Sequence, residues 1–581
     1  MKKNFAARAA TFAVALSVIA GLTACGEERT LNPDIYENES QYVKYADDGT
    51  LLEITKPEKI KLVTDTCLTV ENGRELFVQR YEELTGIDLD LEQPAHNQYY
   101  EKINLSFAGG EMPDVMEVGN TYYPNYANYG ALFDLTDIWE VSDLKNGRMK
   151  DWNGDVVTID EKYVDALKIT SDKNKDGIIT EDEKDRLYGF PMTRGNGTVT
   201  YVRGDWIKEL GDAGKLGYNH KDDTFTYKGE EIDFSDDYME QFGEYMEYMP
   251  QNYDEFLSML RAFKDKRNDI IPLTAAGLIN SEAPYDIYLR EFYQDARPDF
   301  YIPEGGDKYV DGMSEPQMID ALQRMQDAFK EGLMDREIIT NQTSTARNKF
   351  YEDKVGCFNY WSGMWCQNLN RDLKKQNPDG VAVPMPPLVE TEYIERPPTA
   401  LAVTTAAENP WGIYKYVCEL SHDGADGQML FSRGVEGELI KDGDKVKEVT
   451  GHFKWIEKNK TAEALPSIQT PDSTEVVEKS WYSPELSITS FPDPVYIKPI
   501  ITSSLDMFGK TSRVNPVPKM TLNIADAMTE ITTIRQEVIA KVVKGEMTPQ
   551  EGVKDYETRA ALEIETMMKE LNGASEETEA E

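Results

Sequence analysis

Basic residues, cysteines and histidines are scarce in this chain of 581 residues. Lysine and arginine together number 62 against 105 aspartates and glutamates, which gives a formal net charge of -43. A field of that sign repels phosphate backbones, so nucleic acid is a poor partner. The five cysteines show no paired framework. We expect buried thiols, and a disulfide between Cys357 and Cys366 is the alternative.

Long apolar runs are also missing beyond the first 25 residues, so no later segment is expected to span a membrane. At the start, three basic residues precede an apolar stretch from Ala9 to Gly21, which is typical of a secretory signal. The next residues, Leu22-Thr23-Ala24-Cys25, resemble a bacterial lipobox. The resemblance implies that residues 1–24 are removed and that a lipid on Cys25 holds the protein at the extracellular face of the cell membrane. The alternative is an ordinary signal with a chance cysteine.

Two segments have the composition of unstructured chain. Residues 25–56 are acidic and polar and are predicted to form a flexible tether, and residues 573–581 form an acidic tail that is too poor in apolar residues to pack. Roughly 510 residues lie between them, enough for two to four domains. With 40% hydrophobic and 10% aromatic residues, a substantial core is possible.

Residues 172–183 fit the twelve-residue calcium loop of an EF-hand. Gly177 permits the sharp turn, and the oxygen ligands would come from Asp172, Asn174, Asp176, the backbone of Ile178, Thr180 and Glu183. The alternative is an Asp-rich surface turn. Because the loop stands alone in an extracellular chain, we expect a permanent structural Ca²⁺ rather than a signalling switch.

Segments with the apolar spacing of a β-strand alternate along the chain with segments that have the apolar spacing of an α-helix. Strand-like residues 61–64, 87–91 and 114–118 enclose two segments of helical spacing, 74–83 and 99–107. This order predicts a parallel, helix-covered sheet. Further helices are predicted over 255–263, 316–329, 524–543 and 549–571, and extended segments over 381–387 and 401–405.

Short motifs recur in a familiar order, namely Gly109–Val115, Gly130–Thr136, Tyr188–Pro191, Tyr201–Trp206, Asn252–Phe256, Lys354–Phe358, Pro384–Pro387 and Gly434–Gly437. In this order the chain resembles the bacterial extracellular solute-binding proteins that feed ABC importers. The ending Lys544–Glu551 looks like the large lipoprotein branch of their sugar-binding group, family 1 type. Each motif alone is weak, and their common order carries the resemblance.

The resemblance implies an α/β fold of the type II periplasmic-binding-protein kind, with two lobes, a hinge and a ligand cleft between the lobes. The first lobe is expected to comprise residues 57–192, with the EF-hand-like calcium loop, and to return over 345–398. The second is expected to comprise 193–344 and 399–572. Residues 211–249 look like an insertion beyond the common pattern.

Sugar sites pair aromatic faces with planar hydrogen-bonding side chains. Such residues occur where the family carries its ligand contacts, and the candidates are Asp65, Asn120, Tyr122, Tyr123, Arg194, Tyr285, Asn359, Trp361 and Trp365. We expect at least one of the last two to be a ligand platform, while the two tyrosines at 122 and 123 divide evenly between cleft and surface. Trp206 and Trp411 are expected to pack in the core.

An extracellular glycan-degrading enzyme is the less favoured alternative. Its two carboxylates cannot be recognised among 105 acidic residues, and neither His-Glu-x-x-His nor Gly-x-Ser-x-Gly occurs. The repeats or stalks of an adhesion module are absent as well. The prediction is a monomeric, non-enzymatic receptor that captures an oligosaccharide and delivers it to the transmembrane subunits of an ABC importer. A peptide or another small polar nutrient is the alternative ligand.

Overall fold

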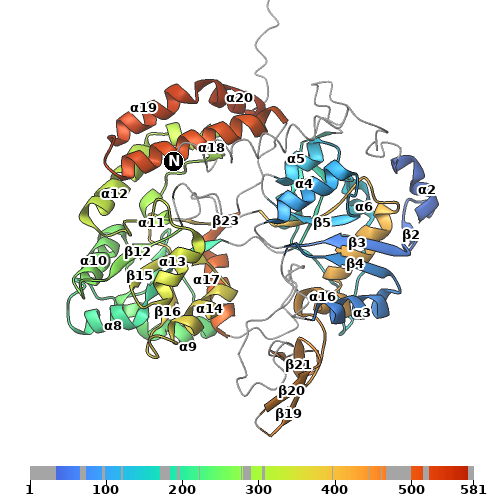
Figure 1. The fold of residues 1–581 in the computed structure, drawn as a ribbon, viewed down its shortest axis with the longest axis horizontal. Helices are drawn as coiled ribbons and strands as arrows, with labels where there is room; N and C mark the ends of the chain where they lie inside the picture. Colours follow the sequence, from blue (N-terminus) through green and yellow to red (C-terminus); the bar gives the residue numbers. More distant parts are fainter. Residues whose placement is uncertain are drawn as a thin grey trace, which may run out of the picture. The chain divides into compact units, whose positions relative to one another are not determined.

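The protein divides into two compact units, Met1–Arg194 with Pro397–Tyr496 and Gly195–Arg396 with Ile497–Glu581 (Figure 1). The computed structural model describes residues 35–65, 73–94, 98–119, 122–170, 183–192, 197–221, 223–276, 278, 289–303, 306, 308–395, 397–443, 445–459, 461–465, 499–514 and 522–572. Within these ranges no helix has both the length and the apolar character needed to cross a membrane.

The first unit contains a five-stranded sheet in the order β4-β3-β5-β18-β8. Its strands and the two helices between the first three are β3 Lys59–Val63, α3 Arg74–Thr85, β4 Asp88–Glu92, α4 Tyr99–Gly109, β5 Val115–Val118, β8 Phe190–Pro191 and β18 Ala400–Val403. β3 pairs in parallel with β4 and β5, which confirms the predicted strand-helix alternation. β18 is antiparallel to β5 and to β8, so the sheet is mixed rather than parallel throughout.

Short helices and strand pairs complete the first unit. They are α5 Tyr122–Asn128, α6 Thr136–Val141, α7 Glu161–Asp165, β6 Lys168–Ile169, β7 Arg186–Leu187, α15 Pro410–Ile413, η8 Tyr414–Glu419, η9 Leu420–His422, α16 Asp426–Arg433, β19 Leu439–Asp442, β20 Lys445–Val449, β21 Phe453–Glu457 and β22 Thr461–Ala464. Trp411 is buried among them, as predicted.

The prediction of a flexible tether over residues 25–56 is wrong for its described part. This part forms η2 Ile35–Asn38, α2 Glu39–Tyr42, β1 Val43–Tyr45 and β2 Leu51–Ile54. Tyr36 stacks on Phe133 with ring centroids 4.7 Å apart, and Tyr42 stacks on Trp411 at 5.9 Å. The segment is polar on average, but it contains a few aromatic and aliphatic side chains with enough apolar area to pack.

The second unit contains a four-stranded sheet in the order β12-β15-β9-β16. The strands are β9 Thr198–Arg203, β12 Ile271–Thr274, β15 Val355–Trp361 and β16 Ala382–Pro384. β12 and β15 are parallel, whereas β9 is antiparallel to β15 and β16. All six residues of β9 are buried, as expected for a central strand with both faces covered.

The elements around this sheet are mainly helices. They are α8 Gly204–Asp212, β10 Thr226–Tyr227, β11 Glu230–Glu231, α9 Asp236–Phe242, η6 Gly243–Tyr248, α10 Tyr253–Lys264, α11 Arg290–Tyr293, β13 Phe300–Tyr301, β14 Val310–Asp311, η7 Gly312–Ser314, α12 Gln317–Glu331, α13 Thr343–Tyr351, α14 Met364–Leu373, β17 Tyr393–Glu395, α17 Pro499–Thr511, β23 Ser512–Val514, α18 Leu522–Val543, α19 Pro549–Arg559 and α20 Ala561–Asn572. The predicted helix over 549–571 is thus divided in two near Ala560.

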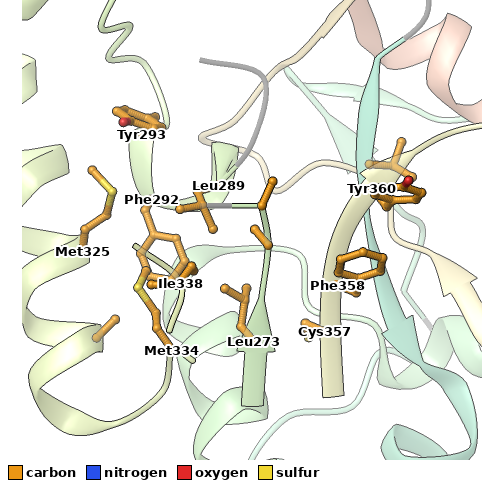
Figure 2. Packing of buried hydrophobic residues seen from close by; sticks show 14 of the residues in the cluster. Leu273, Leu289, Phe292, Tyr293, Met325, Met334, Ile338, Cys357, Phe358 and Tyr360 are labelled. Carbon is orange, nitrogen blue, oxygen red and sulfur yellow. The ribbon is translucent and has the colours of Figure 1, made fainter. Parts of the chain in front are cut away.

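Apolar side chains from α11, α12, β12 and β15 form one core in the second unit (Figure 2). The periodicity of α12 places Met318, Leu322 and Met325 on its buried face. The helix ends at Gly332, which adopts φ 77° and donates its N–H back to the last turn. Trp206 is buried in this core, as predicted.

The expected lobe boundaries are wrong in the second half of the chain. β15 belongs to the sheet of the second unit, so residues 345–396 do not return to the first. β18 pairs with β5, which places residues 397–496 in the first unit instead. An apolar strand pattern does not specify which sheet the strand joins, because either sheet would bury it equally well. Residues 211–249 are an integral part of the second unit, where the Tyr238 hydroxyl donates to the carbonyl oxygen of Pro384 at 2.7 Å.

Candidate ligand-binding elements

In the first unit, polar groups gather where β3 and β5 end. Asp65 follows β3 and is half-buried, and its backbone N–H donates to Glu117 Oε2 at 2.9 Å. The Tyr99 hydroxyl lies 3.1 Å from the carbonyl oxygen of Val63 and 2.7 Å from that of Glu117. Because the carboxyl ends of parallel strands share one edge of a sheet, these contacts hold Asp65 and Glu117 side by side.

A pair of tyrosines forms an aromatic surface next to this edge. Tyr100 on α4 and Tyr122 on α5 stack with ring centroids 3.7 Å apart and planes inclined by 5°. The Tyr100 hydroxyl accepts from the N–H of Gly119, directly after β5. Burial raises the pKa of both phenols, so their hydroxyls remain neutral hydrogen-bonding groups at physiological pH.

Tyr123, which is adjacent to Tyr122, is turned into the core. It is 1% exposed, and its hydroxyl donates to the carbonyl oxygen of Leu167 at 2.8 Å and accepts from the N–H of Tyr188 at 2.9 Å. In the described structure Tyr123 is therefore a packing residue rather than a ligand platform.

In the second unit, Asn359 and Trp361 lie near the carboxyl end of β15. Asn359 is buried and Trp361 is half-buried at the rim of the core. The carbonyl oxygen of Trp361 accepts from the Tyr201 hydroxyl at 2.7 Å, which fixes the end of the strand. Side chains alternate along a strand, so Asn359 and Trp361 share one face of the sheet and Tyr360 points to the other.

Trp365 lies in the first turn of α14 and packs against Tyr360 on that other face. The two rings meet edge to face at 4.8 Å. The Arg347 guanidinium lies 4.8 Å from the Trp365 ring and donates to the Tyr360 hydroxyl at 2.6 Å. Trp361 and Trp365 therefore do not form one continuous platform. The sequence reasoning missed Arg347, because no periodicity brings residue 347 next to residue 365.

Asn359 was predicted, but its two buried polar neighbours, Thr200 and Glu291, were missed. Thr200 of β9 lies directly opposite Asn359 in the sheet register, and its hydroxyl contacts both the Asn359 amide and the carboxyl group of Glu291 on α11. Glu291 is fully buried, and burial raises its pKa. Polar residues inside apolar segments were the only available signal in the sequence.

Several predicted site residues lie outside the described part of the chain, namely Cys25, Asn120, Asp172, Asn174, Asp176, Ile178, Thr180, Arg194 and Tyr285. Glu183, the last position of the calcium loop, is described and is buried in the first unit. Within the described ranges, no group of three or more His, Cys, Asp or Glu residues could hold a metal ion.

The described cysteines outside the signal are buried thiols, as expected. Cys357, Cys366 and Cys418 are free, so the possible bridge between the first two is not formed. Burial raises the pKa of each thiol, which leaves them protonated and unreactive at neutral pH.

Residues 71–417 match the family model described as bacterial extracellular solute-binding protein. No curated protein matches the chain. A solute-binding protein for N-glycan transport, NgtS from Streptococcus pneumoniae, is 16% identical and superimposes with a TM-score of 0.54, covering 89% of this chain and 98% of that one.

Two further solved structures are similar to the chain. The S. pneumoniae ABC-transporter substrate-binding protein FusA, as an EF-hand mutant in complex with fructo-nystose, gives 15% identity, a TM-score of 0.52 and coverage of 88% and 99%. An HMO-binding ABC-transporter-associated solute-binding protein from Bifidobacterium longum infantis is 13% identical and superimposes with a TM-score of 0.54. The match covers 88% of this chain and 98% of that one. These similarities confirm the predicted type II periplasmic-binding-protein fold.

Proposed function

Because the chain belongs to the family of bacterial extracellular solute-binding proteins, we propose that it captures an oligosaccharide and delivers it to an ABC importer. The observation that carries this proposal is the family match over residues 71–417. Relatives of the same fold are described as an N-glycan transport protein, as FusA with fructo-nystose and as an HMO-binding protein, which supports a saccharide as the ligand class.

The aromatic surfaces at the strand ends fit this ligand. A pyranose or furanose ring offers C–H faces that stack on aromatic rings and hydroxyls that need hydrogen-bonding partners. The first unit offers Tyr122, stacked on Tyr100, and the half-buried Asp65 that follows β3. The second unit offers Trp361 at the end of β15. Each of these aromatic surfaces, taken by itself, would stack on one sugar ring of the ligand.

We also assign a structural Ca²⁺ to the loop 172–183. Its donor set of carboxylate, amide, hydroxyl and backbone oxygens suits this hard cation. The description of one FusA structure as an EF-hand mutant supports an equivalent loop in a protein of this fold. Glu183 would anchor the ion to the folded unit, because it is buried three residues before the start of β7.

The lipid on Cys25 would keep this receptor near its importer and raise the effective concentration of their encounter. Metabolic labelling with a radioactive fatty acid tests this assignment. The wild-type chain should carry the label, and Cys25→Ser should lose it and leave the membrane fraction. A Cys25→Ser protein that remains labelled and membrane-bound would contradict the assignment.

The binding site is tested by calorimetry on residues 26–581 with Trp361→Ala. Loss of one stacking surface should weaken saccharide binding by about tenfold or more. The matched control is Trp152→Ala, which removes a half-buried indole that packs on Trp455 at 5.9 Å in the first unit. Equal affinities of the Trp361 variant and the wild type would show that the site is misplaced.

A further inference from the structure

The short helix α11 is a strained element of the second unit. All four of its side chains, Arg290 to Tyr293, are buried. Leu289 before the helix has φ 56°, and Gln294 after it has φ 54° with ψ −115°. Both are non-glycine residues in conformations that side chains with a Cβ rarely adopt, so the surrounding structure must hold this turn in place. Figure 2 shows Leu289 and Phe292 packed beside Leu273 and Ile338.

The strained turn places Glu291 against two strands. Its Oε1 accepts from the Thr200 hydroxyl, and the oxygen of that hydroxyl accepts from the Asn359 side-chain amide. Thr200 and Asn359 lie directly opposite each other in neighbouring strands. The chain of bonds therefore runs from Asn359 through Thr200 to Glu291, with one proton donated at each step.

Two oxygen atoms, one at each end of this series of hydrogen bonds, have no donor within the described structure. No described residue donates a hydrogen bond to Glu291 Oε2 or to Asn359 Oδ1, although both atoms are buried. An ionised carboxylate has no proton to give, so in that form two buried acceptors would remain unsatisfied. A protonated Glu291 can instead donate from Oε2 to Asn359 Oδ1. Every member would then donate one hydrogen bond and accept one.

We propose that Glu291 is a neutral carboxylic acid that closes a ring of three hydrogen bonds with Asn359 and Thr200, and that this ring positions the Trp361 end of β15 for the ligand. The positioning role rests on the proposed function, whereas the ring does not. Trp361 lies two residues after Asn359 on the same face of the sheet, opposite Thr198. Fixing Asn359 thus fixes the side chain that would stack on the sugar.

Burial, rather than the neighbouring groups, favours the neutral form of Glu291. Cys357 on β15 and Tyr393 on β17 are neutral near pH 7, because burial raises the pKa of each. Arg290 is the neighbouring cation, but it does not form a salt bridge with Glu291 within the described structure. Its guanidinium donates to the carbonyl oxygens of Glu392, Gln294 and Ala296 at 3.0, 2.8 and 3.3 Å. Burial raises the pKa of Glu291 and outweighs the polar contacts of Thr200 and Asn359 and the charge of Arg290, which lower it.

Infrared difference spectroscopy between the wild type and Glu291→Gln tests the ring at about pH 7. The wild type should show the carbonyl band of a protonated carboxyl group, and the variant should lack it. Glutamine should fold normally, because its amide supplies the same donor and acceptor. The matched control is Asp134→Asn, which removes a buried carboxylate paired with Arg186 at 2.7 Å and should change no such band. Absence of the band in the wild type, or failure of Glu291→Gln to fold, would overturn the proposal.

Calorimetry with the bound saccharide tests the positioning role. Thr200→Val opens the ring without changing the shape of the side chain and should weaken binding about tenfold, whereas Glu291→Gln should bind like the wild type. With rising pH the wild type should lose affinity relative to Glu291→Gln, because only the wild type can ionise. Thr274→Val, a buried threonine on β12 that bonds Asp335 at 2.8 Å, is the control. Unchanged affinity in Thr200→Val would refute positioning. A wild type that binds no saccharide would refute the proposed function, and the infrared band would still decide the ring.

Discussion

Acid should destabilise the first unit through one buried histidine. His422 is 1% exposed, its ring meets Phe190 edge to face at 5.1 Å, and its Nδ1 lies 2.9 Å from the carbonyl oxygen of Cys418. Burial lowers the pKa of His422 from 6.5 to about 4. In the unfolded chain the same imidazole has its ordinary pKa, so between these values the unfolded state binds more protons. This contribution to stability is complete above about pH 6.5 and is lost as the pH falls.

The size of the effect follows from the two pKa values. One pKa unit corresponds to about 1.4 kcal/mol, so lowering the pH from about 7 to about 5 should remove about 2 kcal/mol of the free energy of unfolding through this group. Urea unfolding of the wild type and His422→Gln at both pH values isolates the contribution, because all other groups are shared. The destabilisation by the substitution should shrink by about 2 kcal/mol at the lower pH.

His220→Gln is the control for this experiment. His220 lies in the second unit between the carboxylates of Asp223 and Glu255, so its removal should not alter the acid sensitivity of the first unit. A penalty of the His422 substitution that is equal at both pH values would refute the reasoning.

Three other substitutions test separate features of the protein. Asp172→Ala, or a calcium chelator on the wild type, should lower the melting temperature and the bound calcium; if both stay unchanged, the loop holds no ion. Tyr123→Phe should lower the free energy of unfolding, measured in urea, by about 1–2 kcal/mol but leave the saccharide affinity unchanged. A loss of affinity would show that Tyr123 contributes to ligand binding. Gly356→Ala should destabilise the second unit by about 1–3 kcal/mol. The new Cβ would lie 2.3 Å from the Phe263 ring and 2.9 Å from the carbonyl oxygen of Pro272, so normal stability would show that this strand can shift.

Local elements were predictable where one periodicity dominates. The run from β3 to β5 follows its apolar pattern closely, because each strand and helix buries one set of side chains against its sequence neighbours. The amphipathic helices α10 and α12 were found for the same reason. The N-cap of α10, where Asn252 accepts from the N–H of Glu255, agrees with a start at Tyr253.

Assignments that depend on distant partners were not predictable. β15 and β18 have similar apolar sequences, yet they belong to different units, and only their pairing with β9 and β5 decides this. The site shows the same limit. Trp361 was predicted as a candidate ligand platform, but the hydrogen bonds that join Glu291, Thr200 and Asn359 connect three separate segments. Hydrogen-bond satisfaction inside a core becomes visible only when all partners are placed.

The central claim is that this protein binds an oligosaccharide without altering it. Calorimetric titration of residues 26–581 with a panel of oligosaccharides and peptides, followed by mass spectrometry of the recovered ligand, tests it most directly. We expect saturable binding of at least one saccharide, recovered intact, and no binding of the peptides. Cleavage of a glycan, or binding of peptides alone, would contradict it.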